Sequence, residues 1–184
     1  MKLILVRHGQ TEENNQGIII GQNPGKLSTE GIESAKKLAA VLKTRDVDYI
    51  VSSDLKRCVD TATILVNGRG LSVVFDERLR EIDFGEYQGK PYSALIDDYG
   101  TDIDKKFPSG ESNRQFITRV IDAVNEIYRK HRSDTVLIVS HSGVISIVLA
   151  AYHGFTFAKA LAELKIGNAT KVEVELYLEL TYPA

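Results

Sequence analysis

The sequence predicts an α/β fold, a three-layer αβα sandwich with a mainly parallel sheet, and three observations support this prediction. Segments typical of strands alternate with segments typical of helices, which is the order that helical crossovers between parallel strands produce. Two strand-like runs, Leu3–Val6 and Thr135–Val139, are apolar without alternation, as expected of central strands covered on both faces. The 184 residues contain no Pro/Gly/Ser-rich linker and no repeat, so we expect a single domain over residues 1–184.

The remaining elements follow from local patterns. Ser28 is a good N-cap for a helix that ends near Lys43 and has a regular apolar face. Ser52-Ser53-Asp54 is expected to form the turn and cap before the next helix. We expect further helices over residues 54–66, 112–132 and 144–152, and short strands over residues 49–51 and 71–75. Alternation in Leu161–Ile166 and Lys171–Leu180 predicts two final strands paired across Gly167-Asn168, which would give the sheet an antiparallel edge.

Composition excludes several classes of function. A net charge of −2, from 23 basic and 25 acidic residues, gives no reason to expect nucleic acid or a membrane as partner. Any basic cluster must therefore be local and suited to a small anion. The single cysteine, Cys58, excludes an intramolecular disulfide, and it is expected to be a packing residue. No run is long enough to cross a bilayer and no signal peptide is recognisable, so the predicted location is cytoplasmic.

Both apolar strands end in a histidine that glycine follows within two residues. The first is followed by Arg7-His8-Gly9 and the second by His141-Ser142-Gly143. Ligands of open α/β sheets bind at the carboxyl ends of the strands, so these side chains are candidates for one site. The two other histidines, His131 and His153, lie at predicted helix ends and are expected to be solvated or capping groups.

These motifs resemble those of the histidine phosphatase, or phosphoglycerate mutase-like, superfamily. The resemblance spans nearly the whole chain and implies the fold of that superfamily. It is carried by Leu-Val-Arg-His-Gly-Gln-Thr-Glu at 5–12, Leu-Ser-Thr-Glu-Gly-Ile-Glu-Ser-Ala at 27–35, Ser-Ser-Asp-Leu-Lys-Arg at 52–57 with Thr61-Ala62, Leu-Arg-Glu-Ile-Asp-Phe-Gly at 79–85, Gly110-Glu111-Ser112, and Val-Ser-His-Ser-Gly-Val-Ile at 139–145. One such block is weak evidence, whereas blocks in the family's order make a specific match.

The resemblance implies a role for each residue of the expected site. His8 corresponds to the nucleophile, His141 to the second histidine, and Glu81 to the proton donor. Arg7 and Arg57 correspond to the two arginines that clamp the phosphate. The expected substrate-binding set consists of these two arginines together with Thr11, Asn14, Gly21, Gln22, Ser142 and Gly143.

The chemistry of these residue types supports the same roles. Guanidinium groups bind phosphate oxygens bidentately, and two nearby arginines favour the neutral form of a nucleophilic imidazole. Glu81 must be protonated when it acts as an acid; burial and bound phosphate would raise its pKa, whereas Arg57 would lower it. Alternatively, Glu81 bridges to Arg78 or Arg80.

A metal site at the two histidines is the main competing interpretation of the chemistry. It is disfavoured because neither histidine is followed by residues at ligand spacing, and because two arginines would repel a cation. We therefore expect no metal and no cofactor. Backbone amides around Ser142 and Gly143, at the start of a helix, could add donors for an anion.

The predicted function is a metal-independent phosphatase that hydrolyses a small phosphorylated metabolite through a phosphohistidine. A 2,3-bisphosphoglycerate-dependent phosphoglycerate mutase and a catalytically silent phosphate-binding module remain alternatives. The mutases of the superfamily that this chain resembles have a longer insertion between the proton-donor block and the Gly-Glu-Ser block, and a Trp in the first loop. Here only residues 82–109 separate Glu81 from the Gly-Glu-Ser block and the chain has no Trp, so the resemblance favours the phosphatase over the mutase. Residues 86–110 are expected to form a lid. Aromatic residues of this region could shape the leaving-group pocket or belong to the core: Phe84, Tyr87, Tyr92 and Phe107. The protein is expected to be a monomer or a homodimer.

Overall fold

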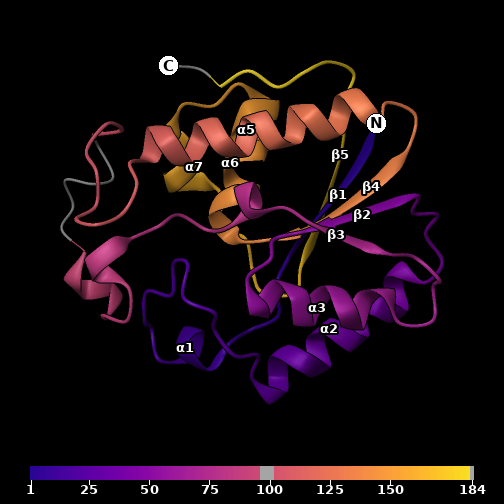
Figure 1. The fold of residues 1–184 in the computed structure, drawn as a ribbon, viewed down its shortest axis with the longest axis horizontal. Coiled ribbons are helices and arrows are strands. Elements are labelled where there is room, and N and C mark those ends of the chain that lie inside the picture. The colour runs from indigo at the N-terminus through magenta and orange to yellow at the C-terminus, as the bar shows by residue number, and fades with distance from the viewer. Residues whose placement is uncertain (96–101, 183–184) are drawn as a thin grey trace.

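The computed structural model describes residues 1–95 and 102–182 and contains a mainly parallel sheet (Figure 1). The order of its five strands is β3-β2-β4-β1-β5. The first four pair in parallel, and β5 pairs antiparallel to β1 at one edge. The strands are β1 (Lys2–Arg7), β2 (Tyr49–Ser52), β3 (Val73–Phe75), β4 (Thr135–Ser140) and β5 (Lys171–Glu175).

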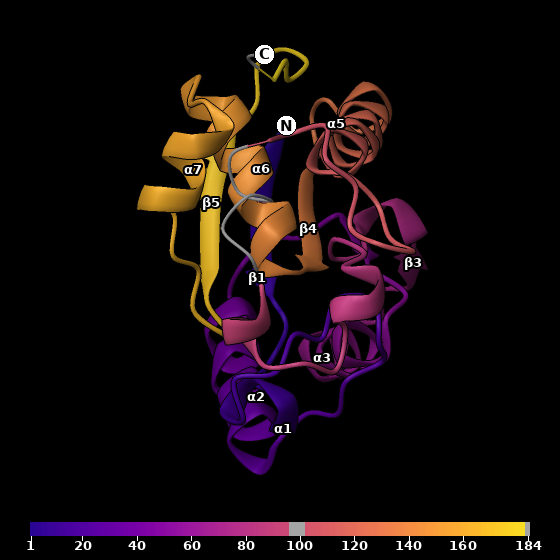
Figure 2. The ribbon, with the colours of Figure 1, turned by 90° about the vertical axis from the view of Figure 1, so that its left-hand side faces the viewer.

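Helices cover both faces of the sheet, which confirms the predicted three-layer α/β sandwich. Figures 1 and 2 show α2 and α3 on one face and α5, α6 and α7 toward the other. The helices are α1 (Glu12–Asn15), α2 (Thr29–Leu42), α3 (Lys56–Val66), α5 (Asn113–Lys130), α6 (Ser142–His153) and α7 (Phe157–Glu163). Single 3₁₀ turns lie at Glu77–Leu79, Gly85–Tyr87 and Tyr92–Ala94.

The two central strands have buried side chains on both faces. In β1, Leu3 and Leu5 belong to the apolar cluster beneath α5 and α6, whereas Ile4 and Val6 belong to the cluster beneath α2 and α3. Burial of each such side chain contributes about 1.5–3 kcal/mol. The same alternation in β4 explains why both strands are apolar without a polar face. Because β1 and β4 are parallel neighbours, their carboxyl ends meet at one edge of the sheet.

Helix capping follows the sequence at two of the three expected positions. The Ser28 side chain accepts from the Gly31 N–H at the start of α2, and Ser112 forms a capping box with Gln115 at the start of α5. At α3 the prediction differs from the structure, because the N-cap is Leu55, which makes no side-chain cap. Ser53 instead accepts from the Leu55 N–H and stabilises the turn before the helix.

The predicted strand at Leu161–Ile166 is wrong, because residues 157–163 form helix α7. Thr156 caps this helix by accepting from the Lys159 N–H. Alternation over six residues does not distinguish a strand from a short helix, and the segment is rich in helix-forming Ala, Leu, Lys and Glu. The antiparallel edge exists, but β5 pairs with β1 rather than forming a hairpin, and it ends at Glu175 rather than Leu180.

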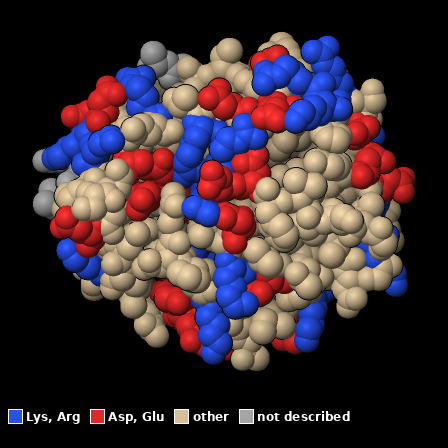
Figure 3. Space-filling view, viewed as in Figure 1, with Lys and Arg blue, Asp and Glu red and all other residues tan. Residues whose placement is uncertain are grey.

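The segment expected to act as a lid, residues 86–110, is only partly covered by the description. It contains two of the 3₁₀ turns, and residues 96–101 lie outside the described residues. The lid therefore stays a prediction. In the face drawn in Figure 3, basic and acidic side chains are interspersed, in line with the small net charge. Among the described helices, none combines the length and the apolar character that a bilayer span needs.

Candidate active site

The two predicted histidines lie side by side at the carboxyl edge of the sheet. His8 follows β1 and His141 follows β4, and the His8 N–H donates to Ser140 O at 2.9 Å. The two rings meet edge to face with centroids 5.3 Å apart. Both are buried, with exposed fractions of 3% and 0%. The structure thus brings together two residues that are far apart in the sequence, as the strand pattern indicates.

The His8 ring is held as a neutral imidazole with its lone pair on Nε2. Its Nδ1 lies 2.8 Å from Gly9 O and donates to it, which leaves Nε2 as the acceptor. Arg57 Nε donates to this Nε2 at 3.2 Å. Burial, and after it the charge of Arg57, hold the pKa of His8 well below its usual range. A neutral imidazole is the form that a nucleophile requires.

Arg57 connects both histidines to the loop that follows β1. Its guanidinium is 1% exposed, and Nη2 donates to His141 Nδ1 at 3.0 Å and to Gly21 O at 2.7 Å. Nη1 donates to Asn23 O at 2.6 Å. Gly21 has a φ of 54°, a conformation that favours glycine, and this turns its carbonyl toward the arginine. Arg57, the predicted phosphate clamp on α3, is therefore preorganised by backbone oxygens of the loop that follows β1.

His141 is also neutral, in the opposite tautomer. Because Nδ1 accepts from Arg57, Nε2 carries the proton and donates to Ser53 Oγ at 2.9 Å. Burial, then the positive charge of Arg57, lower the pKa of His141 well below its usual range. Cys58 Sγ lies 3.4 Å from the same Nε2, and burial raises the pKa of this thiol to about 12, so it stays protonated. Cys58 is buried, as expected of a packing residue. The contact of Ser53 with His141 was not predicted from the sequence.

Glu81 faces the start of α6 rather than an arginine. Its Oε2 accepts from the Gly143 N–H at 3.2 Å and its Oε1 from the Ile82 N–H at 3.1 Å. A Cβ at position 143 would lie 2.3 Å from Glu81 Oε1, so only glycine allows this approach. The alternative of a bridge from Glu81 to Arg78 or Arg80 is wrong. The guanidinium of Arg78 binds Asp76 and Glu126, and that of Arg80 binds Asp54.

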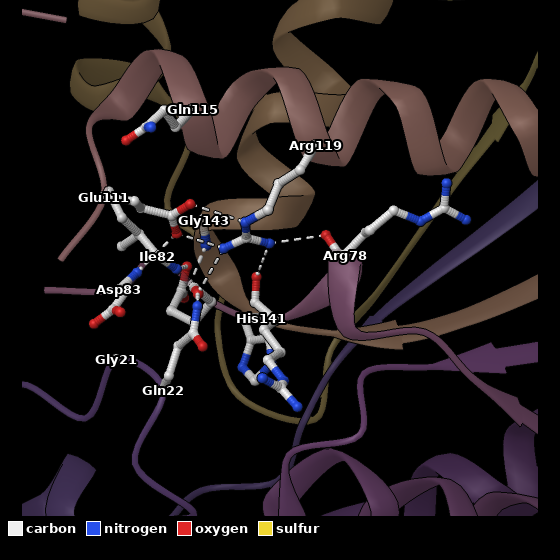
Figure 4. Close-up of polar contacts among 12 residues, drawn as sticks. Gly21, Gln22, Arg78, Ile82, Asp83, Glu111, Gln115, Arg119, His141 and Gly143 are labelled. Atoms are coloured by element: carbon white, nitrogen blue, oxygen red, sulfur yellow. Dashed lines mark hydrogen bonds and ion pairs between the residues drawn. The ribbon is translucent and has the colours of Figure 1, made fainter. Parts of the chain in front are cut away.

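Arg119, which the sequence analysis missed, holds the segment that carries Glu81. Figure 4 shows it reaching from α5 to this segment. Its guanidinium donates to Arg78 O, Arg80 O and Glu81 O, each at 2.8 Å, and it binds Glu111 at 2.6 and 3.0 Å. Glu111 Oε1 also accepts from the Asp83 N–H at 2.8 Å. The sequence holds one indication of the contact between Arg119 and Glu111. Arg119 lies eight residues, about two helical turns, after this Glu of the Gly-Glu-Ser block.

The predicted substrate-binding residues divide into those that line a cavity and those that support it. Arg7, Asn14, Gly21, Arg57, Ser142 and Gly143 line a cavity of about 460 Å³ together with His8 and Glu81. Thr11 is buried and caps α1, where its Oγ1 accepts from the Asn14 N–H. Gln22 donates to Glu81 O at 3.3 Å. Thr11 and Gln22 therefore contact residues that line the cavity and are not among the lining residues themselves.

Arg7 enters the same cavity from the end of β1. Its Nη1 donates to Ile166 O, whereas its Nε is buried without a partner among the described residues. Asn14 Oδ1 accepts from Asn168 Nδ2 at 3.2 Å. Of the aromatic candidates, Phe84, Tyr92 and Phe107 line the cavity. Tyr87 instead packs edge-on against Phe107, with ring centroids 6.1 Å apart.

This set of groups suits phosphate better than a metal ion. His8 Nε2 and His141 Nδ1, the two nitrogens with lone pairs, both accept from Arg57, whose charge disfavours a cation at that position. Within the described residues, His, Cys, Asp and Glu side chains do not gather into a set of three that could hold a metal. A neutral imidazole beside two guanidinium groups and a carboxyl group can transfer a phosphoryl group.

We predict that the buried histidines make stability depend on pH. In the unfolded chain both titrate near a pKa of about 6.5, whereas in the native state their pKa values lie well below this. Between the two values the unfolded chain binds more protons, so the free energy of unfolding is retained above about pH 6.5 and falls below it. From pH 7 to 5.5 we expect a loss of about 1 kcal/mol per histidine.

Denaturant unfolding at several pH values measures this effect. The His8→Gln variant, and the double variant that also carries His141→Gln, should lose correspondingly less stability between pH 7 and 5.5 than the unmodified protein. Carboxyl groups contribute equally to the pH dependence of unfolding in all three proteins. The difference in pH dependence between the proteins therefore reports the histidines alone. The same pH dependence in all three would contradict neutral burial.

Comparison with known proteins decides the family. The sequence profile described as "Histidine phosphatase superfamily (branch 1)" matches residues 3–179. The chain belongs to this superfamily. The predicted family is thus confirmed, as are the predicted fold class and the prediction of a phosphatase of this superfamily.

Relatives in the superfamily carry different names. The chain is similar to "Phosphoserine phosphatase 1" of Hydrogenobacter thermophilus, with 32% identity over 86% of this chain and 79% of that protein. It is 29% identical to a "Probable phosphoglycerate mutase" of Enterobacter sp. (strain 638), over 92% of this chain and 82% of the relative. A mycobacterial glucosyl-3-phosphoglycerate phosphatase solved with VO3 has a TM-score of 0.83 and 32% identity, covering 94% of this chain and 91% of its own. The family is therefore established, whereas these names differ in substrate and reaction.

Proposed function

We propose that this protein is a metal-independent phosphatase that hydrolyses small phosphomonoesters through a phosphohistidine on His8. The observation that carries the proposal is the state of His8, a buried neutral imidazole whose Nδ1–H is fixed by Gly9 O. Its Nε2 keeps a lone pair in a cavity that also holds Arg7, Arg57 and Glu81. Each group that phosphoryl transfer requires is thus present without a metal ion.

In the first half of the reaction, His8 Nε2 attacks phosphorus and the bond between phosphorus and the ester oxygen breaks. The Arg7 and Arg57 guanidinium groups hold the phosphoryl oxygens and balance their charge. Glu81, as a carboxylic acid, gives its proton to the departing oxygen. In the second half, Glu81 takes a proton from water, which attacks the phosphohistidine and releases inorganic phosphate. The histidine returns to its neutral form.

Arg57 serves a second purpose in this cycle. Because it is held by Gly21 O and Asn23 O, its position is set before the substrate binds, and little reorganisation is needed in the transition state. Together with burial, which is the larger cause, its charge lowers the pKa of both imidazoles and keeps them unprotonated. His141 donates to Ser53 and accepts from Arg57, so it orients the clamp.

A phosphoglycerate mutase is the second candidate, favoured by relatives that carry that name. The experiment that separates the two uses EDTA throughout. One incubation contains p-nitrophenyl phosphate, and a parallel one contains 3-phosphoglycerate with 2,3-bisphosphoglycerate. We expect phosphate release from the first and no rapid formation of 2-phosphoglycerate in the second. Fast isomerisation, or the lack of phosphate release in the presence of EDTA, would overturn the proposal.

A silent binding module would need none of the preorganisation around the acid. Glu81 is held by two backbone N–H groups, and its segment by three carbonyl contacts to Arg119. Recognition of phosphate alone requires the arginines but no positioned carboxyl group. This arrangement supports an enzyme over the module.

We predict that Arg119 acts by positioning Glu81. Arg119→Lys keeps a cation next to Glu111 but has one nitrogen in place of the planar group that contacts three carbonyl oxygens. Misplacement of the acid should lower kcat/KM for an alkyl phosphate about 10- to 100-fold. The loss should be smaller for p-nitrophenyl phosphate, whose leaving group departs without a proton.

The matched control is Arg129→Lys on the same helix, where the arginine forms an exposed ion pair with Glu179. It should leave both activities unchanged. Equal losses on both substrates in Arg119→Lys, at unchanged melting temperature, would show that Arg119 does not act through the acid.

A further inference from the structure

Apart from the phosphate-binding groups, most of the side chains that line the active-site cavity are apolar. The loop after β3 and the lid segment contribute aromatic side chains, and α5 and α6 contribute Phe116 and Ile147. Helix α7 contributes Phe157, and its C-cap residue is Leu164, which also lines the cavity. Phe107, Phe116 and Ile147 are almost fully buried. These segments come from four distant parts of the chain, so only the folded protein defines this surface, which is here called the leaving-group end.

Among the residues that the structure describes, no basic side chain lines the leaving-group end. Arg7 and Arg57 are the only Lys or Arg residues among the described residues that line the cavity, and both belong to the phosphate-binding end. The nearby Arg119 stacks on the Phe116 ring at 4.7 Å, and its guanidinium binds Glu111 and three carbonyl oxygens. Residues 96–101 and 183–184 contain neither Lys nor Arg in the sequence.

The polar side chains among the other residues that line the cavity carry no charge, and they are Tyr92, Asn113, Ser146 and Tyr182. Tyr182 lines the cavity, and its Oη is buried without a hydrogen-bond partner among the described residues. Burial raises the pKa of Tyr182 to about 12, so the hydroxyl keeps its proton. It can donate to an uncharged oxygen of a ligand. A phenol does not offset the charge of a carboxylate.

We propose that the substrates are monophosphates of uncharged, largely apolar alcohols or phenols, and that phosphate esters carrying a carboxylate are poor substrates. This inference rests on the proposed function and defines its substrate class. An apolar leaving group gains from burial against the aromatic and aliphatic side chains. A carboxylate would lose its hydration at this end without finding a cation. Phosphoserine and phosphoglycerate, which the names of several relatives mention, belong to the disfavoured class.

The test compares two esters that differ in charge but hardly in shape. The 4-carbamoylbenzyl and 4-carboxybenzyl phosphates have leaving groups of nearly equal size, and benzyl phosphate is the apolar reference. We expect kcat/KM to be at least about 100-fold lower for the carboxylate than for the amide. O-phosphoserine and 3-phosphoglycerate should be as poor as the carboxylate or poorer. Equal rates for the amide and the carboxylate would overturn the inference.

A variant tests whether electrostatics causes the preference for the amide over the carboxylate. Leu164→Lys places a cation at the half-buried edge of the leaving-group end, where an added charge can stay hydrated. The preference for the amide over the carboxylate should fall at least about tenfold. Leu178→Lys makes the same chemical change at an exposed position outside the cavity and should keep the preference of the unmodified protein. An unchanged preference in Leu164→Lys would contradict the electrostatic explanation.

The outcomes separate this inference from the proposed function. Hydrolysis of p-nitrophenyl phosphate together with equal rates for the amide and the carboxylate would leave the phosphatase in place and reject the substrate class. No hydrolysis of any ester, p-nitrophenyl phosphate included, would reject the phosphatase itself, and the substrate class with it.

Discussion

His8→Ala is expected to abolish hydrolysis of every phosphate ester, with kcat lowered at least about 10⁴-fold. The variant removes the only lone pair that the site directs into the cavity beside Arg57, namely that of His8 Nε2. His141 cannot replace it, because it is fully buried and is not among the residues that line the cavity, and its Nε2 donates to Ser53. Initial rates with p-nitrophenyl phosphate measure the loss.

A labelling experiment tests the covalent step directly. The protein is mixed rapidly with an ester that is radiolabelled on its phosphoryl group and is then denatured in alkali. The unmodified protein should retain the label, and acid should release it, as expected of phosphohistidine. His8→Ala should retain none. The matched control is His153→Ala, at the exposed end of α6, which should keep both activity and label. Normal turnover in His8→Ala would refute the phosphohistidine mechanism.

The second large effect is expected for Glu81→Gln, and it should depend on the leaving group. The amide oxygen can still accept a backbone N–H, so the loop should keep its conformation, but the side chain can no longer supply a proton. For benzyl phosphate, whose alkoxide needs protonation, we expect kcat/KM to fall about 10²- to 10⁴-fold. For p-nitrophenyl phosphate, the loss in phosphoenzyme formation should be much smaller.

Pre-steady-state kinetics separates the two steps, because Glu81 also takes the proton from water in the second. With p-nitrophenyl phosphate, the variant should show a burst of nitrophenol followed by slow turnover. Glu77→Gln, a change at a largely exposed carboxylate in the 3₁₀ turn before the same segment, is the control and should behave as the unmodified protein. Equal losses for both leaving groups without a burst would argue that another group is the acid.

Much of the fold could be predicted because its signals are local or periodic. The uninterrupted apolar character of β1 and β4 reports burial on both faces, and the serine caps of α2 and α5 report helix starts from a few neighbouring residues. The wrong prediction of a strand in place of helix α7 also follows from the use of local periodicity. Over six residues the helical and the strand periodicity of apolar side chains overlap, and only packing decides between them.

The sequence by itself determined which chemical groups the site contains. Two histidines that follow buried parallel strands must meet at the same edge of the sheet, because the strands they follow are neighbours there. Arg7, Arg57 and Glu81 were identified through motifs whose order along the chain resembles the family. Motifs specify residue types, and in this protein they were sufficient to name side chains that the structure brings together in one cavity.

Only the tertiary structure decided how these groups are held and what surrounds them. Arg57 and Arg119 act through backbone carbonyl oxygens, and every residue has such an oxygen, so no pattern of side chains identifies the contact. The apolar leaving-group end is assembled from the loop after β3, α5, α6 and α7. Among the described residues that line it there is no cation, and this is a property of the assembly, because the nearly balanced charge of the whole chain does not show where charges are absent.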